Sequence, residues 1–168
     1  MAAPRLLTMD LSRVRGLTWQ CRIFACIYTQ MLPTPCHCTR LRRAARLATR
    51  IYDEVLSGSG LKVTQYSLMR AVERLGGASI SELAEATGLE RSAAGRNLRP
   101  LERDGVVAIT GGGDQRSRTV RLTAAGRKRL GDAERRWFVA QRRLAAALGE
   151  QDLNALSGLL DRFLKHAG

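Results

Sequence analysis

The chain has 168 residues with a formal net charge of +13, and 45% of its residues are hydrophobic. This hydrophobic content allows a packed core and excludes a globally disordered chain. The charge favours a polyanionic partner, nucleic acid before an anionic membrane, although high arginine usage across a proteome also yields basic surfaces.

We interpret residues 1–35 as an N-terminal extension of uncertain order, within which Met31 is an alternative start of translation. All four cysteines lie in the first 38 residues, which disfavours a disulfide-stapled secreted fold. The apolar run LTWQCRIFACIYTQML is too short and too polar to span a bilayer, and the LPTPC segment at its end is a poor cleavage site. We therefore expect a cytoplasmic protein with no place in the membrane.

Apolar residues at three- and four-residue spacing predict two helices after this extension. The first begins at about Thr39 and ends at the SGSG of residues 57–60. The second has Thr64 as its N-cap and ends at Gly76 and Gly77, because glycine readily takes the left-handed conformation that closes a helix.

Two short helices joined by a glycine-containing turn are predicted next. Ser81 opens the first, whose buried side consists of Leu83, Ala84 and Ala86. Gly88 in the turn can take a positive φ at little cost. The second begins at about Arg91 and is closed by Gly105, with Pro100 predicting either a kink or an early end. Its inner face consists of Ala94, Leu98 and Leu101.

The pairs Val107/Ile109 and Val120/Leu122 alternate as strands do, so they predict a hairpin with the loop GGGDQRSR. A long helix then runs from Ala124 to about Leu148 with one apolar stripe, and Asp152 can cap a last helix. The stripe consists of Leu130, Ala133, Trp137, Ala140, Leu144 and Leu148. The last helix is apolar over much of its circumference, which a partner subunit would explain.

A helix-turn-helix followed by a basic hairpin is the element order of a winged helix. The expected fold is therefore mainly α with a small β-hairpin, a winged helix-turn-helix with a helical dimerisation region. The outer side of the second short helix carries the side chains that could reach base edges and phosphates of double-stranded DNA. These residues are Ser92, Ala93, Gly95, Arg96 and Arg99.

Residues 36–166 resemble the MarR family of winged helix-turn-helix transcriptional regulators, through the segments VTQYSLMRAV, SISELAEATGLERSAAGRNLRPLERDGVV and GDQRSRTVRLTAAGR. The resemblance implies a dimerisation region at 36–60 and 124–168 and a DNA-binding domain at 61–123. It also implies a homodimer that represses, or less often activates, nearby genes. It further implies release from DNA by a small molecule, often phenolic, or by thiol oxidation.

The resemblance places particular roles on particular residues. Asp114 and Arg116 match the D-x-R pair of the wing, in which the aspartate braces the loop. Arg116, with Arg118, would enter the minor groove, where narrow A-tract geometry favours arginine. The positions that match the recognition helix are Ser92, Arg96 and Arg99, and the small side chains of Ala93 and Gly95 depart from the pattern, so base specificity does not carry over.

The segment CHCTR at 36–40 places Cys36 and Cys38 at the start of the first helix, where the helix terminus favours thiolate. A redox-sensing thiol, as in some MarR relatives, stands beside the plainer interpretation of small residues that cap the helix. A zinc site is disfavoured because a fourth ligand is missing, and we expect no metal and no cofactor.

A pocket for a phenolic effector would be lined by Arg46, Tyr52, Tyr66, Leu68 and Met69, although core packing also explains each of them. An enzyme is disfavoured, because neither of the two histidines stands near a plausible nucleophile-base pair and no phosphate-cradling G-x-x-x-x-G-K-S motif is present. The alternative to a specific regulator is a non-specific basic protein that binds nucleic acid or a membrane surface.

Overall fold

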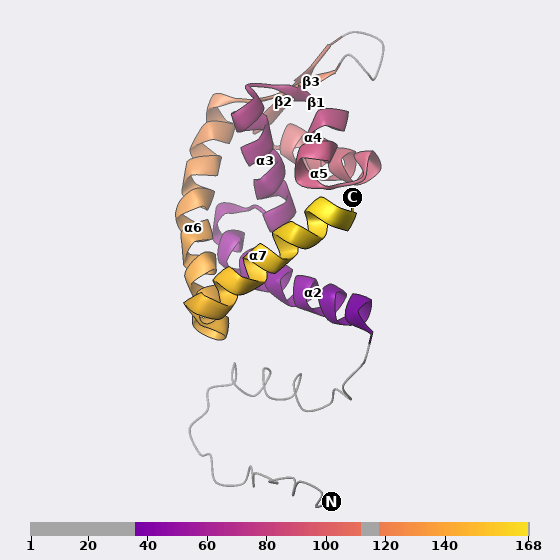
Figure 1. Ribbon diagram of the computed structural model, residues 1–168. Coiled ribbons are helices and arrows are strands. Elements are labelled where there is room, and N and C mark those ends of the chain that lie inside the picture. Colours follow the sequence, from indigo (N-terminus) through magenta and orange to yellow (C-terminus); the bar gives the residue numbers. More distant parts are fainter. Residues whose placement is uncertain (1–35, 112–117, 168) are drawn as a thin grey trace, which may run out of the picture. The chain divides into compact units, whose positions relative to one another are not determined.

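The computed structural model describes residues 36–111 and 118–167, so the extension at 1–35 lies outside the described residues. The chain divides into two units after Arg42. In the second unit, the helix α3 (Val63–Leu75) lies between α6 (Ala124–Leu148) and the pair α4 (Ile80–Thr87) and α5 (Arg91–Arg103) (Figure 1). The predicted fold class, mainly helical with a small sheet, is confirmed.

The helix α2 (His37–Leu56) begins two residues before Thr39 and ends at a 3-10 turn, η2 (Ser57–Ser59). The helix α3 has Lys62 rather than Thr64 as its N-cap, which corrects our prediction. The two backbone N–H groups immediately before Thr64 already have side-chain acceptors. The Lys62 N–H donates to Gln65 Oε1 at 3.0 Å, and the Val63 N–H donates to Asp53 Oδ1 at 2.7 Å. Its C-cap is Gly76 (φ 67°), as predicted.

The N-cap of α4 is Ser79 and not Ser81, because Ser79 forms a reciprocal capping box with Glu82. The Ser79 N–H donates to Glu82 Oε2 at 2.7 Å, and the Glu82 N–H donates to Ser79 Oγ at 3.2 Å. Leu83 and Ala84 are buried as predicted. Ala86 is exposed, which corrects its assignment to the buried side.

The turn between α4 and α5 depends on Gly88, whose φ is 64° as predicted. The helix α5 begins at Arg91 and continues through Pro100 to Arg103, so an early end at the proline is excluded. The last turn is held by backbone hydrogen bonds of 2.9 Å from Asp104 to Pro100 and from Val106 to Leu101. The predicted inner face of Ala94, Leu98 and Leu101 is at most 1% exposed.

The wing is part of a three-stranded antiparallel sheet in the order β1-β3-β2. Strands β2 (Val107–Thr110) and β3 (Thr119–Leu122) form the predicted hairpin, with Ile109 opposite Val120. A third strand, β1 (Ala78–Ser79), was not predicted and pairs with β3. Two residues are too short to display strand periodicity, so only the partner strand makes this segment recognisable.

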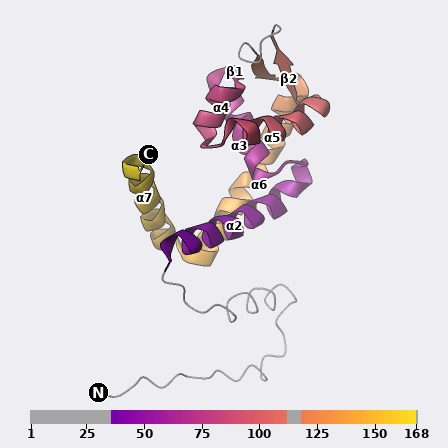
Figure 2. The same cartoon turned by 90° about the vertical axis from the view of Figure 1, so that its right-hand side faces the viewer.

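The helices α6 and α7 (Glu150–Ala167) meet at Gly149, whose φ is 86°. The cap of α7 lies earlier than the predicted Asp152, because the Leu153 N–H donates to the Gly149 carbonyl at 3.0 Å. The helix α7 contacts α6 and stands apart from α4 and α5 (Figure 2). None of its described side chains, residues 150–166, is buried.

Trp137 of α6 stacks on Tyr66 of α3 with ring centroids 6.3 Å apart, which connects the long helix to α3. Leu130 and Ala133 of the predicted stripe belong to the same core. This packing fixes α3, and through α3 the orientation of the helix-turn-helix. Replacing a fully buried leucine of this core by alanine would cost about 2–5 kcal/mol of unfolding free energy.

Candidate nucleic-acid interface

The outward face of α5 carries Ser92, Arg96 and Arg99, and all three are exposed. They are four and three residues apart, so they share one side of the helix. The opposite side is anchored, because Leu98 is fully buried and α5 packs against α3, α4 and β2. A rigid helix with a polar outer face of this kind has the width that the major groove of DNA admits.

Small residues surround this face. Ala93 and Gly95 are half-buried, and Asn97 Nδ2 donates to the Ala93 carbonyl at 2.9 Å. A Cβ added to Gly95 would meet no atom within 4 Å. Nothing within the described fold therefore requires glycine at this position, although glycine costs a helix stability relative to alanine.

Two further arginines of α5, which were not predicted as site residues, are exposed. Arg103 lies four residues after Arg99, and its side chain is 80% exposed. Arg91 is exposed at the start of the helix. Pro100 was expected either to kink the helix or to end it early, so Arg103 was not assigned to the outward face of α5. The same three- and four-residue spacing would have found it.

The structure describes both strands of the wing, whereas residues 112–117 between them lie outside the described residues. Asp114 and Arg116 lie outside the described residues, whereas Arg118 is exposed immediately before β3. The base is braced by Arg121, whose Nη1 donates to the Gly76 carbonyl at 2.9 Å. The wing is thus fixed at its base to the end of α3.

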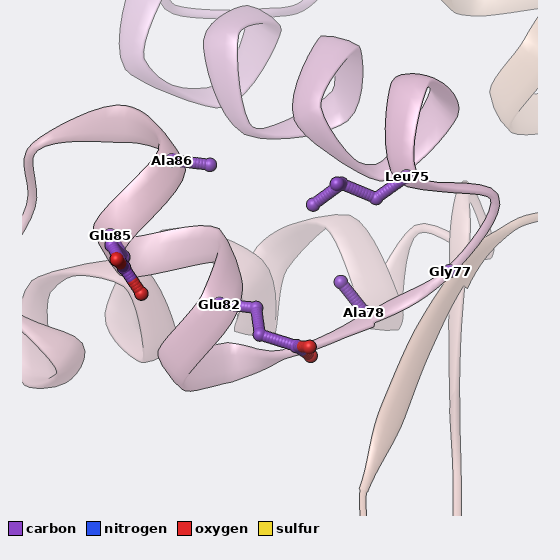
Figure 3. Close-up of a pocket in the computed structure, with 6 residues that line it drawn as sticks. All are labelled: Leu75, Gly77, Ala78, Glu82, Glu85 and Ala86. Atoms are coloured by element: carbon purple, nitrogen blue, oxygen red, sulfur yellow. The ribbon is translucent and has the colours of Figure 1, made fainter.

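Glu82, in the first turn of α4, has a carboxyl group with a lowered pKa. Hydrogen bonds from the backbone and then the hydroxyl of Ser79 lower the pKa of Glu82 below its ordinary value of 4.5. Glu82 also lines a cavity of about 390 Å³ between α3, β1 and α4. Leu75 and Ala86 point toward each other across this cavity (Figure 3).

The five predicted effector-pocket residues are placed differently from one another. Leu68, Met69 and Tyr66 are buried members of the core, Tyr52 packs partly buried against it, and Arg46 is exposed. Burial is the first cause that raises the pKa of Tyr66. None of the five lines the cavity beside Glu82, so their role as an effector pocket stays a prediction.

Cys36 and Cys38 are both exposed at the start of α2. Hydrogen bonds from the Thr39 hydroxyl and the Thr39 backbone lower the pKa of the Cys36 thiol below its ordinary value of 9.0. Cys36 therefore has a larger thiolate fraction at neutral pH than an ordinary cysteine. Across the described residues, no cluster of three or more histidine, cysteine and carboxylate side chains could hold a metal ion.

None of the helices in the described part of the chain has the length and apolar character needed to cross a bilayer.

Comparisons with known proteins agree with this geometry. The MarR family profile matches residues 59–117. The Bacillus subtilis protein YwoH, described as an uncharacterized HTH-type transcriptional regulator, is 25% identical over 126 residues, which are 75% of this chain and 92% of YwoH.

Two solved structures of the transcriptional regulator MosR of M. tuberculosis are similar over 76% of this chain and 97% of theirs. One is 32% identical with a TM-score of 0.63. The other, MosR in complex with DNA, is 35% identical with a TM-score of 0.61. The repressor CouR bound to p-coumaroyl-CoA is 21% identical with a TM-score of 0.71, covers 81% of this chain and 99% of its own, and shares the fold.

Proposed function

This chain belongs to the MarR family of transcriptional regulators, and from that premise we propose that it is a cytoplasmic homodimer that binds specific DNA sequences and represses nearby genes. A small molecule, or oxidation of a thiol, releases it from DNA.

The observation that carries this proposal is the two-sided character of α5. Ala94, Leu98 and Leu101 hold one side in the core, while Ser92, Arg96 and Arg99 stand exposed on the other. Arg96 pairs in a bidentate way with a guanine edge, and Arg99 contacts phosphate. The complex of MosR with DNA, at 35% identity, supports the same use of the fold.

The homodimer is supported by the apolar surface of α7. Leu159, Phe163 and Leu164 are each more than half exposed, and Phe138 of α6 is 55% exposed. Exposure of this much apolar surface to water is unfavourable, so covering it with another protein surface stabilises the helix. A second copy of the chain supplies a matching helix. Light scattering of the purified protein should give the mass of two chains, and a monomer would refute this part of the proposal.

Arg96→Ala tests the proposed base contact. We expect the variant to lose about 1–3 kcal/mol of binding free energy for operator DNA and much less for random duplex DNA. The operator is sought in the DNA upstream of the protein's own gene by footprinting. The matched control is Arg142→Ala on α6, which removes the same charge from another exposed site. An equal loss on operator and random DNA would contradict base readout by Arg96.

The proposal also assigns DNA contacts to the wing, where Arg116 enters the minor groove and Asp114 braces the loop. Arg116→Ala, with Asp114→Ala as its companion, should weaken operator binding if arginine of the wing enters the minor groove. Unchanged affinity would refute that role.

The alternative function is non-specific binding to nucleic acid or anionic membranes, which the charge of +13 favours. Non-specific binding depends on phosphate charge alone, so its affinity is equal for operator and random DNA at every salt concentration. A specific regulator retains a preference of about 10³-fold or more at physiological salt. Measuring both DNAs over a salt series separates these two functions.

A further inference from the structure

A basic groove runs along one face of α6 where this helix passes η2. The groove has a volume of about 770 Å³, and four cationic side chains line it: Lys128, Arg129, Arg135 and Arg136. Asp132 is the single carboxylate among its lining residues. Its lining therefore carries three more positive than negative charges, a local excess that attracts anions.

The four cations differ in what they already bind. Arg135 pairs with Asp132, and Arg129 Nη1 lies 3.4 Å from Asp104 Oδ2. Neither Lys128 nor Arg136 has a carboxylate partner within residues 36–111 and 118–167. Two cations of the groove are thus available for an anion, and a third is held by an ion pair that is only half-buried.

The guanidinium of Arg136 lies directly over Gly58 of η2. A Cβ added at residue 58 would overlap this guanidinium, so the close approach depends on glycine. Gly58 does not have a positive φ, and the backbone of η2 does not itself require glycine there. Gly58 therefore allows the planar donor group of Arg136 to lie along the wall of the groove, where it can present a pair of N–H groups.

The groove also connects to the proposed DNA-reading helix. Asp104, the partner of Arg129, is the C-cap residue of α5. An anion in the groove that binds Arg129 competes with Asp104 for the same guanidinium. One ion pair, Arg129–Asp104, thus connects the lining of the groove to the end of α5.

We propose that this groove is an effector site for a small, multiply charged anion bearing phosphate or carboxylate groups, and that Arg129 and Asp104 couple its occupancy to α5. This inference rests on the proposed function, since it takes α5 as the DNA-binding element. Several cations around one open groove suit a ligand with several anionic groups, because the oxygens of each group can accept charge-assisted hydrogen bonds from a different lysine or arginine.

The first experiment measures binding of inorganic pyrophosphate to the full chain by calorimetry at constant ionic strength. The groove variant is Lys128→Gln with Arg136→Gln. The matched control is Arg142→Gln with Arg143→Gln, which removes the same charge from exposed sites outside the groove on the same helix. We expect the groove variant to bind about tenfold more weakly or worse, and the control to bind as the wild type does. Equal weakening in both variants overturns the site.

Gly58→Ala provides a variant with no change in charge. The added methyl group displaces the guanidinium of Arg136, so pyrophosphate affinity should fall although every cation is retained. Full affinity in this variant would contradict the role given to Arg136.

The second experiment measures operator DNA affinity with and without pyrophosphate. Coupling is reciprocal, so pyrophosphate should shift DNA affinity by the same factor by which DNA shifts pyrophosphate affinity. Asp104→Asn should abolish the shift and leave pyrophosphate binding in place. If the wild type shows no shift, the coupling is overturned.

Two other outcomes are separable from these. In the first, the groove variant loses far more affinity for random DNA than the Arg142/Arg143 control does, and pyrophosphate binds both variants equally. The groove then binds the DNA backbone, and the proposal of an effector site is wrong. If the protein does not prefer its operator, the proposed function fails. The pyrophosphate titration still tests the groove in that case, because it contains no DNA.

Discussion

Arg121 and Gly76, 45 positions apart in the sequence, are joined by a hydrogen bond of 2.9 Å from Nη1 of the arginine to the glycine carbonyl. The same side chain lies over Gly77, whose φ is 125° and whose added Cβ would stand 3.1 Å from Arg121 Cγ. The guanidinium therefore places a positive charge at the C-terminal end of α3, where the helix dipole favours it. It also ties β3, the returning strand of the wing, to the helix that forms the centre of the core.

Arg121→Met should loosen this attachment, because methionine retains an apolar side chain and removes the donor. We expect an unfolding free energy lower by a few tenths to about 1 kcal/mol, since the hydrogen bond is exposed. Amide hydrogen exchange should become faster in β1 and β3. Arg142→Met is the control for charge. Exchange rates in these strands equal to those of the control would show that Arg121 does not brace the wing.

The helices of this fold were predictable because their spacing repeats within the sequence. Ala94, Leu98 and Leu101 recur at helical spacing, and the structure buries all three. The alternation of Val107 and Ile109 predicted a strand for the same reason. Such patterns are local, so one chain without its structure is enough to find them.

The boundaries were less predictable, since they depend on which side chain reaches an amide first. Ser79 and Ser81 are equally good N-caps by residue type, and only the reach of Glu82 back to Ser79 decides between them. Strand β1 and the bond of Arg121 to Gly76 join segments distant in sequence, so no local pattern contains them. Within the candidate site, the face of α5 was predicted, whereas Arg103 was missed because Pro100 was expected to bend or end the helix.

Gly95→Ala separates the stability of α5 from its proposed DNA contact. The added methyl group meets no atom within 4 Å, so the variant should gain about 0.5–1 kcal/mol of unfolding free energy through helix propensity. If Gly95 permits close approach to DNA, operator affinity should fall although the protein becomes more stable. Gly131→Ala in α6, where an added Cβ also meets no atom within 4 Å, is the control. Operator affinity that is unchanged in both variants would refute close approach at Gly95.

Thr39→Val tests the activation of Cys36. Valine has the shape of threonine without the hydroxyl donor, so the first cause of the lowered thiol pKa is removed. The pKa should rise towards 9.0, and alkylation by iodoacetamide at pH 7 should become slower because the thiolate fraction falls. The measurement uses protein with Cys21, Cys26 and Cys38 replaced by serine, so that one thiol reacts. Identical pH profiles with and without the Thr39 hydroxyl would exclude this cause.

The capping box of Ser79 and Glu82 predicts a stability change with pH. The folded-state pKa of Glu82 lies below the ordinary value of 4.5, so its charged form stabilises the folded protein at pH values above 4.5. This contribution is lost as the pH falls through the folded-state pKa, because both states are then protonated.

Glu82→Gln keeps an acceptor for the Ser79 N–H and removes only the charge. In urea unfolding, we expect the variant to be less stable than the wild type at pH 7, with a difference that shrinks below pH 4.5. Glu85→Gln, in the same helix but outside the capping box, reports the general effect of losing a carboxylate. A difference between wild type and Glu82→Gln that stays constant from pH 7 to pH 3 would contradict the lowered pKa.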